Sequence, residues 1–205
     1  ASDVYKRQTM NNPPVNAQNR QFHDDLTLAF DVLSDRDDVR SIVLTGAGKC
    51  FSAGADIKGR VSQKSDLGGH WVHSRRVREC FYSIMECRKP VIAAINGAAL
   101  GAGLAVAASA DILIASESAS IGLPEINVGL LGGGRHAMRL FGHSKTRRLM
   151  LTGQRLSGAE LYRLGVVEEC VPDDDLMGAA LAIAEELASK SPVAMSLAKE
   201  TLNAV

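Results

Sequence analysis

Residues 90–103 read Pro90-Val91-Ile92-Ala93-Ala94-Ile95-Asn96-Gly97-Ala98-Ala99-Leu100-Gly101-Ala102-Gly103. The uninterrupted apolar run 91–95 predicts a short strand that is buried on both faces, as in a parallel sheet covered by helices. The small residues 98–110 predict a helix with glycines at its start. Apolar runs at 41–45 and 111–115 predict two further strands. This strand–helix–strand order is typical of right-handed crossover units in an α/β fold.

Helical spacing of apolar residues surrounds these strands. Residues 19–33 and 70–87 each predict an amphipathic helix, and in the second we expect Trp71, Val77, Phe81 and Ile84 to face inward. After Gly132 the pattern is mainly helical. It predicts helices at 135–141, 145–151, after Ser157, at 173–189 and from Ser191 onward, with one strand at 166–171.

Composition narrows the class of protein. The chain has 205 residues with 46% hydrophobic content, enough for one full-sized core, so a single main domain is expected. The 23 basic residues balance the 23 acidic ones without a long run of like charge, which argues against nucleic acid and anionic membranes as partners. The longest apolar stretch, 90–113, is interrupted by polar residues and glycines, so we expect no membrane span.

The four cysteines (Cys50, Cys80, Cys87 and Cys170) lack the paired spacing of a metal site. In a chain of this size they are typical of reduced thiols in an intracellular protein. Residues 1–8 are polar and lack the apolar core of a signal peptide. We therefore expect a cytoplasmic protein with no metal site.

Two turns that contain glycine each follow an expected strand, one at 51–57 and the other at 96–103. Glycine gives the backbone freedom to turn N–H groups toward a ligand, and two converging N–H groups form an oxyanion hole. Either turn alone is common and usually serves only close packing. Gly101-Ala102-Gly103 lacks the third glycine of a dinucleotide fingerprint, so a nicotinamide site is not expected.

Taken in order, the motifs resemble those of the enoyl-CoA hydratase/isomerase (crotonase) family: Phe51-Ser52-Ala53-Gly54-Ala55-Asp56, residues 90–97, Gly122-Leu123-Pro124-Glu125, and then residues 151–160 and 165–168. The resemblance covers residues 11–205. It implies a crotonase-like α/β spiral of ββα units, with residues 9–205 as a catalytic domain that binds acyl-CoA.

The resemblance also implies a chain that is incomplete at both ends. Residues 1–8 do not resemble the strand with which family members begin, and the family's C-terminal helices would follow Val205. A full-length relative would form a homotrimer or a dimer of trimers. Coenzyme A enters as part of the substrate, and no separate cofactor is expected.

Carried over by position, the resemblance implies that the backbone N–H groups of Ala55 and Ala102 hold the thioester carbonyl. Ala102 stands where many relatives have glycine, which an N–H donor tolerates. The residues expected to bind substrate are Ala53, Asp56, Ile57, Lys58, Gly101 and Pro124. Lys58 could meet a phosphate of coenzyme A, or it could be an ordinary solvated lysine.

Hydratases of the family carry two glutamates over the active site. Here the first position is Ala105 and only the second, Glu125, remains. The apolar neighbours of Glu125 predict a raised pKa, which suits a group that transfers protons. A single base suits migration of a double bond, so we expect isomerisation of 3-enoyl-CoA to 2-enoyl-CoA, with hydration, a lyase reaction, as the alternative.

Two other classes remain open on the sequence. The first is a serine hydrolase that uses Ser52 or Ser109, although no Gly-x-Ser-x-Gly elbow is present. The second is a protein that binds acyl-CoA without turning it over. Arg135 and His136 depart from the glycine-rich family pattern, and we expect them at the surface or as helix caps rather than lining the pocket.

Overall fold

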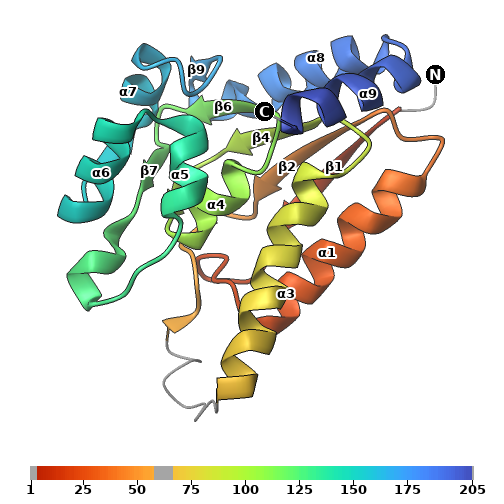
Figure 1. The fold of residues 1–205 in the computed structure, drawn as a ribbon. Coiled ribbons are helices and arrows are strands. Elements are labelled where there is room, and N and C mark those ends of the chain that lie inside the picture. The colour runs from red at the N-terminus through yellow and green to blue at the C-terminus, as the bar shows by residue number, and fades with distance from the viewer. Residues whose placement is uncertain (1–3, 58–66, 205) are drawn as a thin grey trace.

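Two sheets form the frame of the computed structural model, which describes residues 4–57 and 67–204 (Figure 1). The larger sheet is parallel throughout and has the order β1 (Tyr5–Met10), β2 (Ser41–Gly46), β4 (Val91–Ile95), β6 (Ile112–Ser116) and β9 (Cys170–Val171). The smaller sheet has the order β3 (Cys50–Ser52), β5 (Ala98–Leu100), β7 (Ser120–Gly122) and β8 (Arg155–Ser157), with β8 antiparallel.

The chain winds through these sheets as a spiral. Each turn gives one strand to the larger sheet, the next strand to the smaller sheet, and then a helix. The first such turn is β2, β3 and α3 (Leu67–Met85), and the second is β4, β5 and α4 (Ala102–Ala107). The third is β6 and β7, followed by the 3-10 helix η1 (Pro124–Val128) and α5 (Gly134–Leu140). The predicted α/β spiral of ββα units is confirmed.

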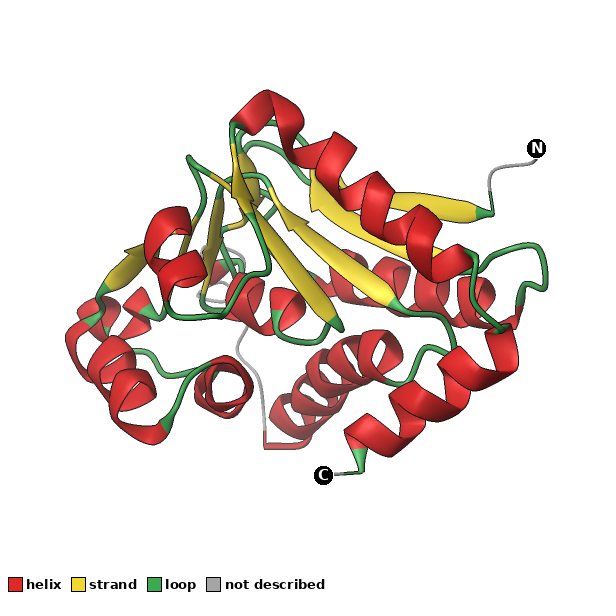
Figure 2. Ribbon diagram, turned by 90° about the horizontal axis from the view of Figure 1, so that it is seen from above, coloured by secondary structure: helices red, strands yellow, loops and turns green. Residues whose placement is uncertain are grey.

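The apolar run of β4 is explained by helices on both faces of the larger sheet (Figure 2). Val91, Ala93 and Ile95 enter the main core, whereas Ile92 and Ala94 enter a second core beneath α8 (Leu176–Ala188). All five side chains are fully buried. Because successive strand residues point to opposite faces, a strand covered on both sides requires apolar residues throughout.

The remaining helices close the two cores. They are α1 (Arg20–Asp35), α6 (His143–Thr152), α7 (Gly158–Arg163), the 3-10 helix η2 (Asp173–Asp175) and α9 (Pro192–Asn203). Ser157 and Glu160 form a capping box at the start of α7, and Ser191 caps α9. These caps satisfy backbone N–H groups that have no partner within the helix, which is why both predicted starts are confirmed.

The N-terminal segment departs from the expectation that residues 1–8 contain no strand. Residues 5–10 form β1, which pairs in parallel with β2 along its whole length. Only Met10 is buried in this strand. An edge strand with little buried surface has a polar sequence, and this is why its pattern did not predict a strand.

Other expectations were wrong in detail. The expected helix at 98–110 is instead β5 followed by the shorter α4, and the expected strand at 166–171 is reduced to β9. Trp71 is 66% exposed rather than inward-facing, while Phe81 and Ile84 are buried as expected. The strands β3, β7 and β8 have three residues each, too few to show a sequence period. No helix of the described residues has the length and apolar character needed to cross a bilayer.

An ion pair between buried Lys199 and the partly exposed Asp111 ties α9 to the body of the fold. The Lys199 side chain is 7% exposed, and its ammonium donates to Asp111 Oδ2 at 2.7 Å and to the carbonyl oxygens of Ile84 and Lys89 at 3.1 Å. Burial raises the pKa of Asp111 more than the ammonium lowers it. Removing the ammonium would therefore leave a partly desolvated carboxylate without its cation, which lowers the stability of the folded protein.

We expect Lys199→Met to lower the free energy of unfolding by about 2–3 kcal/mol, because it deletes three hydrogen bonds from a charged donor and leaves the Asp111 carboxylate with only the Val91 N–H as a donor among the described residues. The matched control is Lys190→Met, whose pair with Glu186 spans 3.5 Å between side chains that are 51% and 72% exposed. This control should stay within about 1 kcal/mol of the parent. Urea unfolding of the two variants checks the difference, and equal losses would contradict it.

Candidate active site

The two predicted turns meet in space. Gly54 and Gly101 both have positive φ values, 89° and 56°. A Cβ atom on Gly54 would lie 2.5 Å from the carbonyl oxygen of Leu100 and 3.2 Å from the backbone nitrogen of Ala102. Only glycine allows this backbone conformation together with such close approach. The turn after β3 therefore packs directly against the turn after β5.

The backbone N–H groups of Ala55 and Ala102 are both available at this junction. Ala55 forms a parallel bridge with Gln18. In this bridge the Gln18 N–H donates to the Gly54 carbonyl oxygen, and the Asp56 N–H donates to the Gln18 carbonyl oxygen. The N–H of Ala55 itself consequently points away from Gln18. Ala102 is the first residue of α4, where an N–H has no partner within the helix. Neither N–H has a backbone acceptor among the described residues.

Glu125 lies over the same junction. It belongs to η1, and a Cβ atom on Gly101 would overlap its Oε1 atom, so the carboxyl group rests against the backbone of the second turn. Oε2 is buried and has no hydrogen-bond partner among the described residues. Burial raises the pKa of Glu125, in the direction predicted from its apolar neighbours.

A cavity of about 540 Å³ contains this junction. Its walls include most of the residues that the sequence predicted for the site: Ala53, Ala55, Ile57, Gly101, Ala102, Pro124 and Glu125. Asp56 is half-buried and is not part of the described wall. Lys58 lies outside the described residues. The structure thus brings together residues from three separate parts of the chain.

Several other residues of the cavity wall were not predicted. His23 from α1, Phe81 from α3, Asn127 from η1 and Arg155 from β8 all line it. They come from elements far apart in the sequence, and although Arg155 lies within the motif at 151–160, no local pattern marks any of them as a residue of the site. Their convergence is a property of the tertiary fold.

Glu125 is the only acidic residue among the described residues that line the cavity. Ala105, at the position where family hydratases carry their first glutamate, is 1% exposed and also lines the cavity. The wall near Glu125 is apolar, and its large side chains Ile57, Val128 and Leu131 are 41%, 62% and 77% exposed. The cavity therefore offers one carboxylate, two free N–H donors and an apolar surface.

The serine-hydrolase alternative does not fit this geometry. The hydroxyl of Ser52 is buried, donates to the Asn16 carbonyl oxygen at 2.7 Å and accepts from Gln18 Nε2 at 3.1 Å. The hydroxyl of Ser109, two residues beyond the end of α4, is buried and donates to the Ala105 carbonyl oxygen at 2.8 Å. Neither serine is part of the described cavity wall. Both hydroxyls donate to backbone carbonyl oxygens and are therefore not available as nucleophiles.

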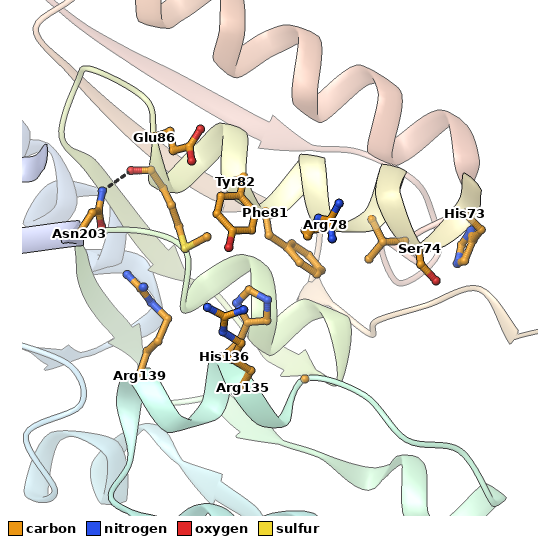
Figure 3. Close-up of a pocket in the computed structure, with 13 residues that line it drawn as sticks. His73, Ser74, Arg78, Phe81, Tyr82, Glu86, Arg135, His136, Arg139 and Asn203 are labelled. Carbon is orange, nitrogen blue, oxygen red and sulfur yellow. Dashed lines mark hydrogen bonds between the residues drawn. The ribbon is translucent and has the colours of Figure 1, made fainter. Parts of the chain in front are cut away.

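Arg135 and His136 line a second cavity, between α3 and α5, also of about 540 Å³ (Figure 3). Arg135 is exposed as expected, but His136 is half-buried, and its ring meets the edge of Phe81 with 4.7 Å between ring centroids. The expected surface position of His136 is therefore wrong. Its Nδ1 atom is buried. The helix α5 has only seven residues, too few for their apolar spacing to predict this burial. The described residues contain no cluster of side chains suited to hold a metal ion.

Comparison with known proteins gives consistent results. Residues 6–205 match the family model described as enoyl-CoA hydratase/isomerase. A probable mitochondrial enoyl-CoA hydratase of Dictyostelium discoideum is 36% identical over 96% of this chain and 71% of its own length. A hydrolase of Mycobacterium tuberculosis, named as acting on (7aS)-7a-methyl-1,5-dioxo-2,3,5,6,7,7a-hexahydro-1H-indene-carboxyl-CoA, is 36% identical over 95% of this chain and 78% of its own length.

Among solved structures, the enoyl-CoA hydratase of Bacillus anthracis matches with a TM-score of 0.89 and 33% identity, over 96% of this chain and 78% of that chain. The family match covers nearly the whole chain, and the similarity extends to both sequence and fold. The protein is therefore a member of the enoyl-CoA hydratase/isomerase family of enzymes.

Proposed function

We propose that the protein is an enoyl-CoA isomerase that moves the double bond of a 3-enoyl-CoA to the 2-position. The observation that carries the proposal is the presence of a single carboxylate, Glu125, beside two free N–H donors in one cavity. In this proposal the N–H groups of Ala55 and Ala102 bind the thioester oxygen. Such fixed donors stabilise an enolate oxygen without the reorganisation that water would need.

The proton balance needs only one group. The Glu125 carboxylate removes a proton from C2 of the 3-enoyl thioester, and the electron pair of that bond forms the dienolate. The carboxylic acid then returns the proton to C4, so the double bond comes to lie between C2 and C3. Apolar surroundings support this role, because a raised pKa makes the carboxylate a stronger base toward the C2 proton.

Hydration of 2-enoyl-CoA is the second candidate, favoured by the names of relatives such as the Dictyostelium discoideum protein. Hydration needs one group to activate water and a source of the proton that adds to C2. The methyl side chain of Ala105 can neither activate water nor supply a proton, and we therefore propose isomerisation rather than hydration. A third possibility, binding without turnover, does not explain a buried carboxylate held over the thioester position.

Product analysis separates these candidates. The protein is incubated with 3-enoyl-CoA and with 2-enoyl-CoA, and products are identified by mass and chromatography. Isomerisation gives a product of unchanged mass from 3-enoyl-CoA, whereas hydration adds the mass of water to 2-enoyl-CoA. Hydration of 2-enoyl-CoA without conversion of 3-enoyl-CoA would establish the second candidate, and no product from either would leave binding alone.

The pH profile should reveal the raised pKa of Glu125. The base must be ionised to remove the C2 proton, so kcat/KM should fall on the acid side. Because burial raises this pKa, the fall should be centred above the ordinary glutamate value of about 4.3. The rate of isomerisation as a function of pH checks this, with stability followed in parallel by circular dichroism. A midpoint at or below the ordinary value would contradict a desolvated base.

Restoring the missing acid should change the reaction. We expect Ala105→Glu to create or increase hydration of 2-enoyl-CoA, since a second carboxylate in the cavity can share the work of activating water. Ala105 is 1% exposed, so the longer side chain has to project into the cavity. The matched control is Ala105→Gln, which has the same size but cannot accept a proton. Equal hydration by the two folded variants would show that the acid is not limiting.

A further inference from the structure

The second cavity lies between α3 and α5 and carries cationic side chains on both walls. Figure 3 shows Arg135, His136 and Arg139 rising from α5 toward Phe81 and Tyr82 of α3, with Arg78 on the same helix. Arg135 and Arg139 are four residues apart and therefore share one face of α5. The end of α9 closes one side, where Asn203 Nδ2 donates to the Met85 carbonyl oxygen at 2.7 Å.

Asp111 lies close enough to Arg139 for the two charges to interact, but no acidic side chain pairs directly with the three arginines in the described part of the chain. None of Arg78, Arg135 and Arg139 forms an ion pair with the described residues, whereas Arg36 and Arg76 elsewhere each pair with an aspartate. The Nε atom of Arg139 donates to the Ala108 carbonyl oxygen at 3.2 Å, which orients its guanidinium group. The acidic residue of the described cavity wall is Glu86. The cavity thus keeps an excess of positive charge.

The pKa of His136 reflects both its burial and this positive charge. Burial lowers its pKa to about 4, and the charges of Arg139 and Arg135 add to the effect. The imidazole is consequently neutral at pH 7, and its buried Nδ1 atom has no hydrogen-bond partner among the described residues. His136 is therefore a neutral part of the cavity wall, and its Nδ1 atom has no surface open to a ligand in this conformation.

The second cavity adjoins the candidate active site. Val77, Phe81 and Gly133 line both cavities, so the two share a wall. An acyl group held by its thioester at Ala55 and Ala102 would pass Phe81 to reach the arginines. The thioester end would then lie in the apolar cavity, and the distal end of the acyl group would lie in the cationic one.

We propose that the cationic cavity binds a carboxylate at the distal end of the acyl group, so that the preferred substrate is an ω-carboxyacyl thioester. The inference rests on the proposed function for the position of the thioester. A guanidinium group binds a carboxylate through two parallel hydrogen bonds, and arginine is the side chain best suited to this geometry. A purely apolar acyl end would form no charge-assisted hydrogen bond with these exposed guanidinium groups.

Phosphate oxygens of coenzyme A share the chemistry of a carboxylate, and the test must separate the two. Calorimetry measures dissociation constants for two pairs of saturated thioesters, which bind without reacting: hexanoyl-CoA with 5-carboxypentanoyl-CoA, and octanoyl-CoA with 7-carboxyheptanoyl-CoA. The same acyl groups are also measured as pantetheine thioesters, which carry no phosphate. The variants are Arg135→Met and Arg78→Met, from different helices, and the control is Arg147→Met on the exposed surface of α6.

We expect the parent to bind at least one carboxylated thioester about tenfold more tightly than its neutral counterpart, the usual effect of a charge-assisted hydrogen bond. Arg135→Met or Arg78→Met should remove this preference, also with pantetheine thioesters, and Arg147→Met should not. Equal affinity for both members of each pair would overturn the inference and leave the proposed function intact. An arginine effect confined to thioesters with phosphate would also overturn it. Absence of binding by every thioester would overturn both proposals.

Discussion

Glu125→Gln should lower kcat for isomerisation by about two to four orders of magnitude, the usual contribution of a positioned acid–base group. Glutamine keeps the size of the side chain over Gly101 but cannot accept the C2 proton. Binding of acyl-CoA should persist, because the expected contacts with the thioester come from backbone N–H groups. Steady-state kinetics together with calorimetric binding of a saturated acyl-CoA measures the two effects separately.

Stability provides a further check on this variant. Because the pKa of Glu125 is raised in the folded protein, the stability that its neutral form provides is lost as pH rises through that pKa. At neutral pH the ionised carboxylate is therefore unfavourable, and Glu125→Gln should be at least as stable as the parent. The control is Glu168→Gln at an exposed position outside the cavity, which should change neither property. Undiminished kcat in Glu125→Gln would remove this residue from the mechanism.

Replacing the Ala102 amide by an ester should lower kcat by about two to three orders of magnitude. The ester deletes one oxyanion donor, a loss that typically costs about 2.7–4 kcal/mol of transition-state stabilisation. Side-chain truncation cannot test a backbone donor. Proline would also delete the N–H, but it restricts the preceding residue, and Gly101 already has an unusual backbone conformation with φ 56° and ψ −117°.

The matched control is an ester at Ala159, in the first turn of α7 and outside the cavity. Both esters remove an N–H near the start of a short helix, so both should perturb folding similarly, as circular dichroism would show. Only the Ala102 ester should slow the reaction. If it turned over as fast as the parent, the turn at Gly101-Ala102-Gly103 would serve only to pack the start of α4.

The parts of the fold that were predicted from sequence are those whose pattern is local. Strand β4 and the centre of β2, residues 42–44, are uninterrupted apolar runs because helices cover both faces of the sheet. The turn residues of the site were predicted through a family resemblance, and the structure places Ala53, Ala55, Ile57, Gly101 and Ala102 in one cavity with Glu125. Glycine was informative there because Gly54 and Gly101 have positive φ values and no room for a side chain.

The remainder depended on contacts between distant segments. The edge strand β1 is polar, and Trp71 has an apolar side chain at a position that α3 leaves exposed. The cationic cavity combines α3 with α5 and the end of α9, and the half-buried His136 packs against Phe81 from another helix. No periodicity within one segment contains this information.

Deuterium uptake tests the central claim most directly, namely that Glu125 forms an enolate beside the two N–H groups. The protein is incubated with 3-enoyl-CoA in D₂O, and the acyl group of recovered substrate and product is analysed by mass spectrometry. We predict that the parent introduces deuterium at C2 or C4 and that Glu125→Gln does so at least about a hundredfold more slowly. Uptake at the parental rate in Glu125→Gln, or neither uptake nor conversion in the parent, would contradict the account, whereas conversion without uptake would mean that Glu125 returns the same proton to C4.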